Sequence, residues 1–149
     1  MNDNRQPTDA ENKPLVLAPE HLAALIAHAR AAAPNECCGI LARRGNAVER
    51  VIPLANADAS PTTFRVAPAD LLAAFEALDA AGLDLVGIYH SHPASPAYPS
   101  PTDVIYARGY PGVRHVIVSL RESDRPEIRA FRIDGERINE VGIDVAVGP

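Results

Sequence analysis

Residues 83–92, LDLVGIYHSH, constrain the fold more than any other part of the chain, because apart from Asp84 they are apolar until the final three. A short run that is apolar throughout is typical of a β-strand buried on both faces, whereas a strand with one face in water alternates. Strands of this kind occur where helices cover the sheet. We therefore expect a central strand here, with helices packed against its sheet.

Helices are predicted where apolar residues recur at helical spacing. Residues 19–33 show this spacing and stop before Pro34, which favours the end of a helix. Residues 68–81 show it again, and Gly82 supplies a typical end. A shorter third helix is predicted from Ser100 to about residue 108. The apolar positions of the first two helices are Leu22, Leu25, Ile26 and Ala29, and then Leu71, Leu72, Phe75 and Leu78.

Further segments have the composition and spacing of strands. Gly45 and Asn46 favour the positive φ angles of a tight turn, which predicts a β-hairpin between the first two. A loop leading into a short strand is expected over residues 57–66. Helices interleaved with strands, followed by a strand-rich end, predict an α/β fold with a mixed sheet. The strand-like segments are residues 37–44, 47–56, 113–120, 127–133 and 137–145.

The length fits one domain. A domain of 149 residues buries roughly two-thirds of the surface of its unfolded chain, so it needs no covalent cross-links for stability. Hydrophobic residues make up 47% and charged residues 22% of the chain, the balance of a globular protein. Residues 1–14 are polar without apolar periodicity, so we expect a disordered N-terminal tail. The folded domain is then expected to span residues 15–149.

Charge and apolar patterning argue against nucleic acid and membranes as partners. The formal net charge is −5, and the 14 Lys and Arg residues form no cluster. The N-terminus lacks an apolar signal segment, and no segment approaches the roughly 18 apolar residues of a membrane span. Cys37 and Cys38 are adjacent, so extended chain would point them to opposite faces and a disulfide between them is not expected. These features predict a cytoplasmic protein with reduced thiols.

The polar end of the central strand carries the pattern His90-Ser91-His92. Residues i and i+2 of a strand share a face, so both imidazoles can converge on one point while Ser91 turns away. Two His and one carboxylate are among the usual protein ligands of catalytic zinc, which leaves a fourth position for water. An isolated pair of histidines would be a weak signal, because such residues are often surface or core groups.

Asp103 supplies the carboxylate. Ser100, Pro101 and Asp103 have the order of an N-cap, a proline at the first helical position and an acidic residue in the first turn. A helix start would fix the direction of the Asp103 side chain toward the two histidines. The alternative is purely structural, with Ser100 only a cap and Asp103 only a carboxylate favoured by the helix dipole.

Glu36 is the candidate general base. Peptide hydrolysis at a zinc site still needs a group that takes a proton from water and delivers it to the leaving amine. Glu36 stands just before the apolar run of residues 37–41, where a carboxylate is unusual unless it faces a site. The alternative is an ordinary solvated loop acid after Pro34. Periodicity alone does not choose between them.

Together these residues resemble the signature of the JAMM metalloprotease family, also called MPN+ or Mov34. That signature is a distant Glu, an HSHP or HTHP motif, a Ser separated from the second His by seven residues, and an Asp separated from that Ser by two. The chain matches it with Glu36, the HSHP of residues 90–93, Ser100 and Asp103. The likeness extends over about residues 15–147, so it leaves out the polar tail.

The resemblance implies an MPN fold of the cytidine-deaminase-like type, with a curved mixed β-sheet flanked by helices. It also implies a role for each residue. His90, His92 and Asp103 would bind one zinc ion per chain. Glu36 would be the catalytic base, and Ser100 would donate a hydrogen bond to the oxyanion.

Within that family the chain looks most similar to small bacterial stand-alone members. Shared segments include residues 27–30, 34–36, 88–92 and 97–100. The resemblance implies a peptidase that releases cysteine from the C-terminal Gly-Gly tail of a ubiquitin-like sulfur-carrier protein, which would be its partner. Pro93 stands where the mycobacterial type carries Thr, so the resemblance leaves the exact substrate open.

Two other functions stay open at this point. One is a JAMM-type peptidase for another ubiquitin-like protein or peptide. The other is a non-catalytic MPN scaffold that binds a partner protein. Scaffolds of that kind typically lack one or more metal ligands, whereas His90, His92 and Asp103 complete the set here.

Overall fold

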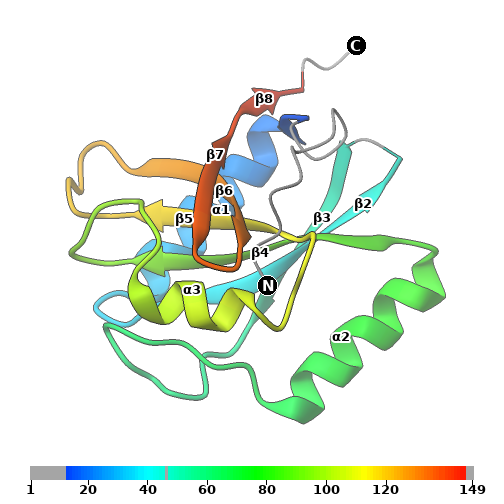
Figure 1. Ribbon diagram of the computed structural model, residues 1–149, viewed down its shortest axis with the longest axis horizontal. Helices are drawn as coiled ribbons and strands as arrows, with labels where there is room; N and C mark the ends of the chain where they lie inside the picture. Colours follow the sequence, from blue (N-terminus) through cyan, green and yellow to red (C-terminus); the bar gives the residue numbers. More distant parts are fainter. Residues whose placement is uncertain (1–12, 46, 147–149) are drawn as a thin grey trace.

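One curved, eight-stranded mixed sheet organises the residues that the structure describes, and three helices pack on it (Figure 1). The structure is a computed structural model that describes residues 13–45 and 47–146. Most of the predicted tail, residues 1–12, lies outside the described residues, as do residues 147–149 of the predicted domain. The elements are β1 Leu15–Leu17, α1 Pro19–Ala32, β2 Cys38–Arg44, β3 Ala47–Leu54, α2 Pro68–Ala81, β4 Asp84–His92, α3 Pro101–Ala107, β5 Arg114–Ser119, β6 Glu127–Asp134, β7 Arg137–Val141 and β8 Ile143–Val145.

The strand that the sequence predicts as central is β4. The strand order is β7-β6-β5-β4-β2-β3-β1-β8, so β4 is inside the sheet, antiparallel to β2 and parallel to β5. Its last six residues are all buried. Tyr89 packs into a core on the side of α1, while Ile88 packs into a second core on the side of α2. The prediction of a strand buried on both faces is therefore confirmed.

A single residue of the chain joins the two edges of the sheet. β7 and β8 lie at opposite ends of the strand order, yet only Gly142 separates them in sequence. The Leu15 N–H in β1 donates a hydrogen bond of 2.9 Å to the carbonyl oxygen of Gly142. Such a connection is possible only if the sheet curves until its edges approach each other, and Figure 1 shows β7 running directly into β8.

Two strand predictions are wrong, and the structure shows a cause for each. Residues 137–145 form two strands instead of one, because the chain changes sheet edge at Gly142 while its apolar alternation continues. The short strand expected at the end of residues 57–66 does not form in the described structure. There the Ala57 N–H donates to the Arg65 carbonyl and the Arg65 N–H donates to Asn56 Oδ1, so the loop closes on itself.

Cys37 and Cys38 are free and buried, as expected for adjacent cysteines in extended chain. The Cys38 thiol lies 3.8 Å from the carbonyl oxygens of Leu54, the last residue of β3, and of Ala55, the residue after it. Burial raises the pKa of Cys38 to about 12, so this thiol stays protonated. Among the described helices, none combines the length and the apolar content that crossing a membrane requires.

Gly39 and Tyr89 form a close cross-strand pair that joins β2 to β4. The two residues lie directly opposite each other in the antiparallel register. The fully buried Tyr89 ring lies over Gly39, where a side chain would overlap two ring carbons and the hydroxyl oxygen. The Tyr89 hydroxyl is also 2.7 Å from His28 Nδ1 on α1, so the ring is held at both ends. Glycine is thus required here by the close approach of the ring.

We expect Gly39→Ala to lower the free energy of unfolding by at least about 2 kcal/mol, because the new methyl group must displace a packed ring. Gly109→Ala is the matched control, since a Cβ there meets its nearest neighbour at an ordinary 3.6 Å. That change should alter stability by less than about 0.5 kcal/mol. Urea unfolding of both variants measures the difference, and equal effects would contradict the packing argument.

Candidate metal centre

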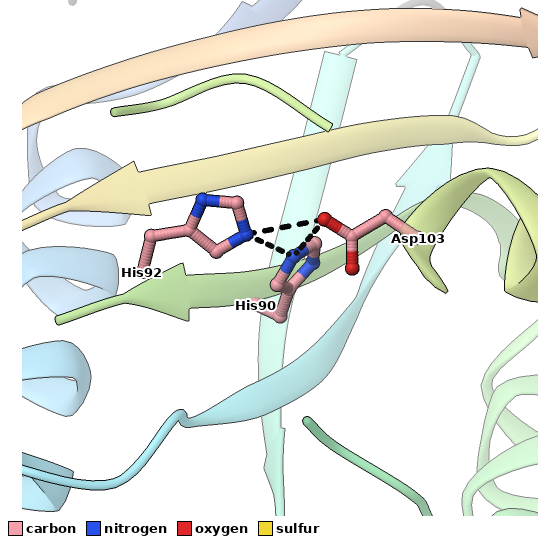
Figure 2. Close-up of side chains that lie close together, drawn as sticks. All are labelled: His90, His92 and Asp103. Carbon is pink, nitrogen blue, oxygen red and sulfur yellow. Dashed lines mark hydrogen bonds and ion pairs between the residues drawn. The ribbon is translucent and has the colours of Figure 1, made fainter. Parts of the chain in front are cut away.

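Three buried side chains converge at the end of β4 (Figure 2). His90 and His92 extend from the same face of this strand, and Asp103 reaches them from the first turn of α3. The two Nε2 atoms are 3.0 Å apart, and each lies 3.1 Å from Asp103 Oδ2. Two segments of chain thus bring three potential ligand atoms to one point.

The dimensions of this group fit a small tetrahedral metal site. Ligand atoms at about 2.0–2.1 Å from a tetrahedral zinc ion stand about 3.3 Å from one another. The three atoms here form a triangle with sides of 3.0, 3.1 and 3.1 Å, so a slight expansion gives that spacing. Two imidazoles and one carboxylate are also the ligand types that zinc prefers. The group is therefore capable of holding a metal ion.

The charge states also suit a cation. Burial alone would raise the pKa of Asp103, but hydrogen bonds from His90 and His92 outweigh it and hold this pKa well below its usual range. Burial lowers the pKa of His90, so this imidazole is neutral at pH 7. For His92, burial also acts to lower the pKa, but bonding to Asp103 and to the Pro96 carbonyl raises it overall. A metal ion bound to Asp103 and the two imidazoles would displace the hydrogen through which they bond one another.

Neighbouring groups fix the orientation of the ligands. His92 Nδ1 is 2.7 Å from the Pro96 carbonyl oxygen, which can only accept, so Nδ1 carries a hydrogen and Nε2 is the nitrogen that faces His90 and Asp103. Phe64 stacks on the His90 ring, with centroids 4.6 Å apart and planes at 21°. The Ser100 N–H donates to Asp103 Oδ2 over 2.9 Å. Sequence reasoning missed Phe64 and Pro96, because no local pattern links them to the histidines.

Ser100 is the N-cap of α3. Its hydroxyl oxygen accepts a hydrogen bond of 3.1 Å from the Asp103 N–H, and its own N–H bonds the Asp103 side chain in return. This reciprocal capping box confirms the predicted helix start. It also means that the same residue that begins the helix holds the carboxylate in place. The structural and the functional interpretations of Ser100 are therefore compatible.

Glu36 is buried beside these groups, with only 4% of its surface exposed. Its Oε1 atom has no hydrogen-bond partner among the described residues. Burial is the main cause that raises its pKa to about 7; His92 acts to lower this pKa and Asp103 to raise it. The interpretation of Glu36 as a solvated loop acid is thus wrong, because the carboxyl group is buried within electrostatic reach of the other site residues.

The backbone around Glu36 is fixed by residues that the sequence did not single out for this purpose. The Glu36 N–H donates to the Ser60 carbonyl over 2.8 Å, and the Asn56 side-chain amide donates to the Glu36 carbonyl over 3.1 Å. The next N–H, of Cys37, donates to Ser91 Oγ over 2.7 Å. Ser91 faces away from the histidines, as expected from strand alternation, and ties the Glu36 segment to β4.

Fold and site together define an α/β domain with a His-His-Asp group that could hold a metal ion and a carboxyl group beside it. Residues 18–134 match the family of prokaryotic homologs of the JAB domain. The chain belongs to this family. Two curated relatives and two solved structures extend the comparison.

The CysO-cysteine peptidase of Mycobacterium tuberculosis is 40% identical over 133 residues, which cover 88% of this chain and 90% of the relative. A probable TtuB-protein conjugate cleaving protease of Thermus thermophilus is 52% identical over 83 residues, 55% of each chain. A solution structure of a Desulfitobacterium hafniense protein matches with a TM-score of 0.80 and 38% identity, covering 89% of this chain and 92% of that one. A JAB1/MPN domain protein from Archaeoglobus fulgidus matches with a TM-score of 0.60 and 20% identity, and the match covers 90% of this chain and 98% of that one. The expected MPN fold is therefore confirmed.

The raised pKa of Glu36 predicts a pH-dependent effect on the stability of the metal-free protein. A carboxyl group with an ordinary pKa near 4.5 in the unfolded chain and about 7 in the folded one costs stability when ionised. This cost is absent well below pH 4.5, grows as the pH rises to 7 and is complete above it. Because Gln does not ionise, Glu36→Gln should gain about 1–2 kcal/mol over the wild type at pH 8.

The measurement is thermal melting of both proteins in chelator at pH 5 and at pH 8. The difference in Tm between Glu36→Gln and the wild type should be larger at pH 8 than at pH 5. Glu76→Gln on α2, a substitution at an ordinary surface position, is the control and should show no such trend. A Glu36→Gln difference that does not change with pH would contradict the buried, uncharged carboxyl.

Proposed function

We propose that this protein is a zinc metallopeptidase that cleaves the peptide or isopeptide bond after the C-terminal Gly-Gly tail of a ubiquitin-like sulfur-carrier protein. The observation that carries the proposal is the buried triangle of His90, His92 and Asp103, with Glu36 beside it, whose Oε1 has no hydrogen-bond partner among the described residues. Full-length similarity to a CysO-cysteine peptidase supports the same chemistry and substrate class. Release of cysteine from such a carrier would place the protein in cysteine biosynthesis.

His90, His92 and Asp103 would hold one zinc ion per chain through two Nε2 atoms and one carboxylate oxygen. When bound, zinc would supply the positive charge that lowers the pKa of a water molecule and polarises the scissile carbonyl. The chain itself contributes a buried environment, because all three candidate ligand residues are at least nine-tenths buried. Water exclusion strengthens every charge interaction in the site.

Glu36 would accept a proton from the attacking water and pass it to the leaving amine. A catalytic base works best when its pKa lies close to the working pH, and burial raises the pKa of Glu36 to about 7. Its position is fixed through its own backbone, which bonds Ser60 and Asn56. A held carboxyl with no protein partner at Oε1 is suited to moving a proton to and from a reactant.

Ser100 would donate a hydrogen bond to the oxygen that gains negative charge when water attacks the carbonyl. Its hydroxyl accepts from the Asp103 N–H, and a hydroxyl that accepts can still donate its own hydrogen. A donor held in place before the reaction stabilises the developing charge without reorganisation. Ser100 would therefore combine the capping of α3 with this catalytic role.

Two alternatives differ from this proposal in testable ways. A peptidase for another ubiquitin-like conjugate has support from the similarity to a TtuB-protein conjugate cleaving protease, and would keep the same site residues. A non-catalytic scaffold would need neither a complete ligand set nor a buried carboxyl beside it. The presence of both in this chain favours an enzyme.

We expect the purified protein to bind one zinc ion per chain, measured by elemental analysis. His92→Ala should lose the metal because it removes one of three ligands. Glu36→Gln should keep the metal but lose at least about a hundredfold in turnover of a carrier protein ending in Gly-Gly-Cys, because it removes the base. Equal zinc in wild type and His92→Ala would overturn the site, and an active Glu36→Gln enzyme would overturn the base.

The two roles of Ser100 respond differently to Asp and Thr. Asp caps a helix as well as Ser does, but when ionised it cannot donate and would put negative charge where negative charge develops. We expect Ser100→Asp to keep its Tm and zinc while turnover falls at least about a hundredfold, and Ser100→Thr to keep partial activity. Turnover, melting and zinc content should be measured together. Near-normal turnover by Ser100→Asp would reduce Ser100 to a helix cap.

A further inference from the structure

The loop that follows His92 is tied to the end of β5 by one buried side chain. Ser119, the last residue of β5, is only 5% exposed and lies beside His92 in the parallel register. Its hydroxyl donates a hydrogen bond of 2.6 Å to the Ser95 carbonyl and accepts one of 3.2 Å from the Arg121 N–H. The next N–H, of Leu120, donates to the His92 carbonyl over 3.1 Å.

The loop matters because it supplies the acceptor that orients His92. The Pro96 carbonyl lies 2.7 Å from His92 Nδ1 and adjoins the Ser95 peptide group that Ser119 holds. The Tyr98 N–H bonds the same Pro96 oxygen over 2.8 Å, and Ala97 is buried in the core beneath α3. The loop is thus anchored on its far side by Ala97 and on its near side by Ser119.

We propose that Ser119 is a positioning residue for the metal centre, acting through the Ser95 and Pro96 carbonyls to hold the His92 ring in the orientation that points Nε2 at His90 and Asp103. The inference rests on the proposed metal site. An imidazole whose Nδ1 has no fixed acceptor can rotate about its side-chain bonds, and a rotated ring no longer presents Nε2 to the metal. Groups that orient a histidine ligand typically change metal affinity by about 10–100-fold.

The first test is zinc affinity of the full chain, measured by competition with a chromogenic chelator. Ser119→Ala should weaken zinc binding by about tenfold, the lower end of that range, because Ser119 acts one residue away from the orienting carbonyl. Ser119→Thr keeps the hydroxyl and should restore most of the affinity. Val48→Ala, buried at the far end of the β2–β3 hairpin, is the control for general loss of stability and should leave the affinity unchanged.

The second test is the exchange rate of the His92 Nδ1 proton in the zinc-loaded protein, read from its imidazole NMR signal. In the wild type this proton faces the Pro96 carbonyl and should exchange slowly with water, as it should in Val48→Ala. Ser119→Ala should exchange it faster, because the loop that carries the acceptor is no longer tied to β5. This readout does not depend on activity, so together with the control it separates a positioning role from a change in fold stability.

The outcomes distinguish this inference from the proposed function. A wild type without zinc affinity would overturn the metal site itself. A wild type that binds zinc, with a Ser119→Ala variant of equal affinity and an unchanged exchange rate of the His92 Nδ1 proton, would overturn the role of Ser119 alone. Ser119→Thr with the same loss as Ser119→Ala would also overturn it, since the hydroxyl would not be the cause.

Discussion

Asp103 Oδ2 is the atom on which the whole centre depends. It lies 3.1 Å from the Nε2 atoms of both His90 and His92, and it accepts the Ser100 N–H over 2.9 Å. A buried carboxylate is costly unless charge-assisted hydrogen bonds surround it. Here the cost is offset by two imidazoles from β4 and by the first turn of α3. The same contacts join a strand and a helix that are separated by a proline-rich loop.

Alternation along β4 divides its residues between two tasks. His90 and His92 face the candidate metal centre, while Tyr89 and Ser91 face the other side and contact the neighbouring strand segment. Ser91 bonds the Cys37 N–H, and Tyr89 covers Gly39, so both hold the segment that follows Glu36. The residues between and around the histidines therefore help to determine where the carboxyl of Glu36 lies. The geometry of the candidate site is a property of two paired strands.

Much of this could be predicted from sequence because it depends on local pattern. The burial of β4, the start of α3 at Ser100 and the shared face of His90 and His92 follow from periodicity and capping, which act over a few residues. The split between β7 and β8 could not be predicted, because it depends on the closure of the sheet.

Prediction of the site from sequence has the same limit, because a local pattern does not reveal contacts between residues far apart in the chain. The burial of Glu36 depends on contacts with Asn56, Ser60 and Ser91, which are far away in sequence. The catalytic roles of Glu36 and Ser100 stay predictions.

Closure of the sheet also gives two parts of the molecule a different order of folding and a different local stability. The seam between β1 and β8 joins three residue pairs, from Leu15 with Ile143 to Leu17 with Val145, at nearly the maximum sequence separation that the chain allows. Contacts of long sequence separation carry the largest loop-closure entropy, so this seam forms late in folding. With so few pairs it can also open before the rest of the sheet. The metal centre lies on β4 and α3, away from the seam in the strand order, so such opening would leave its ligands in place.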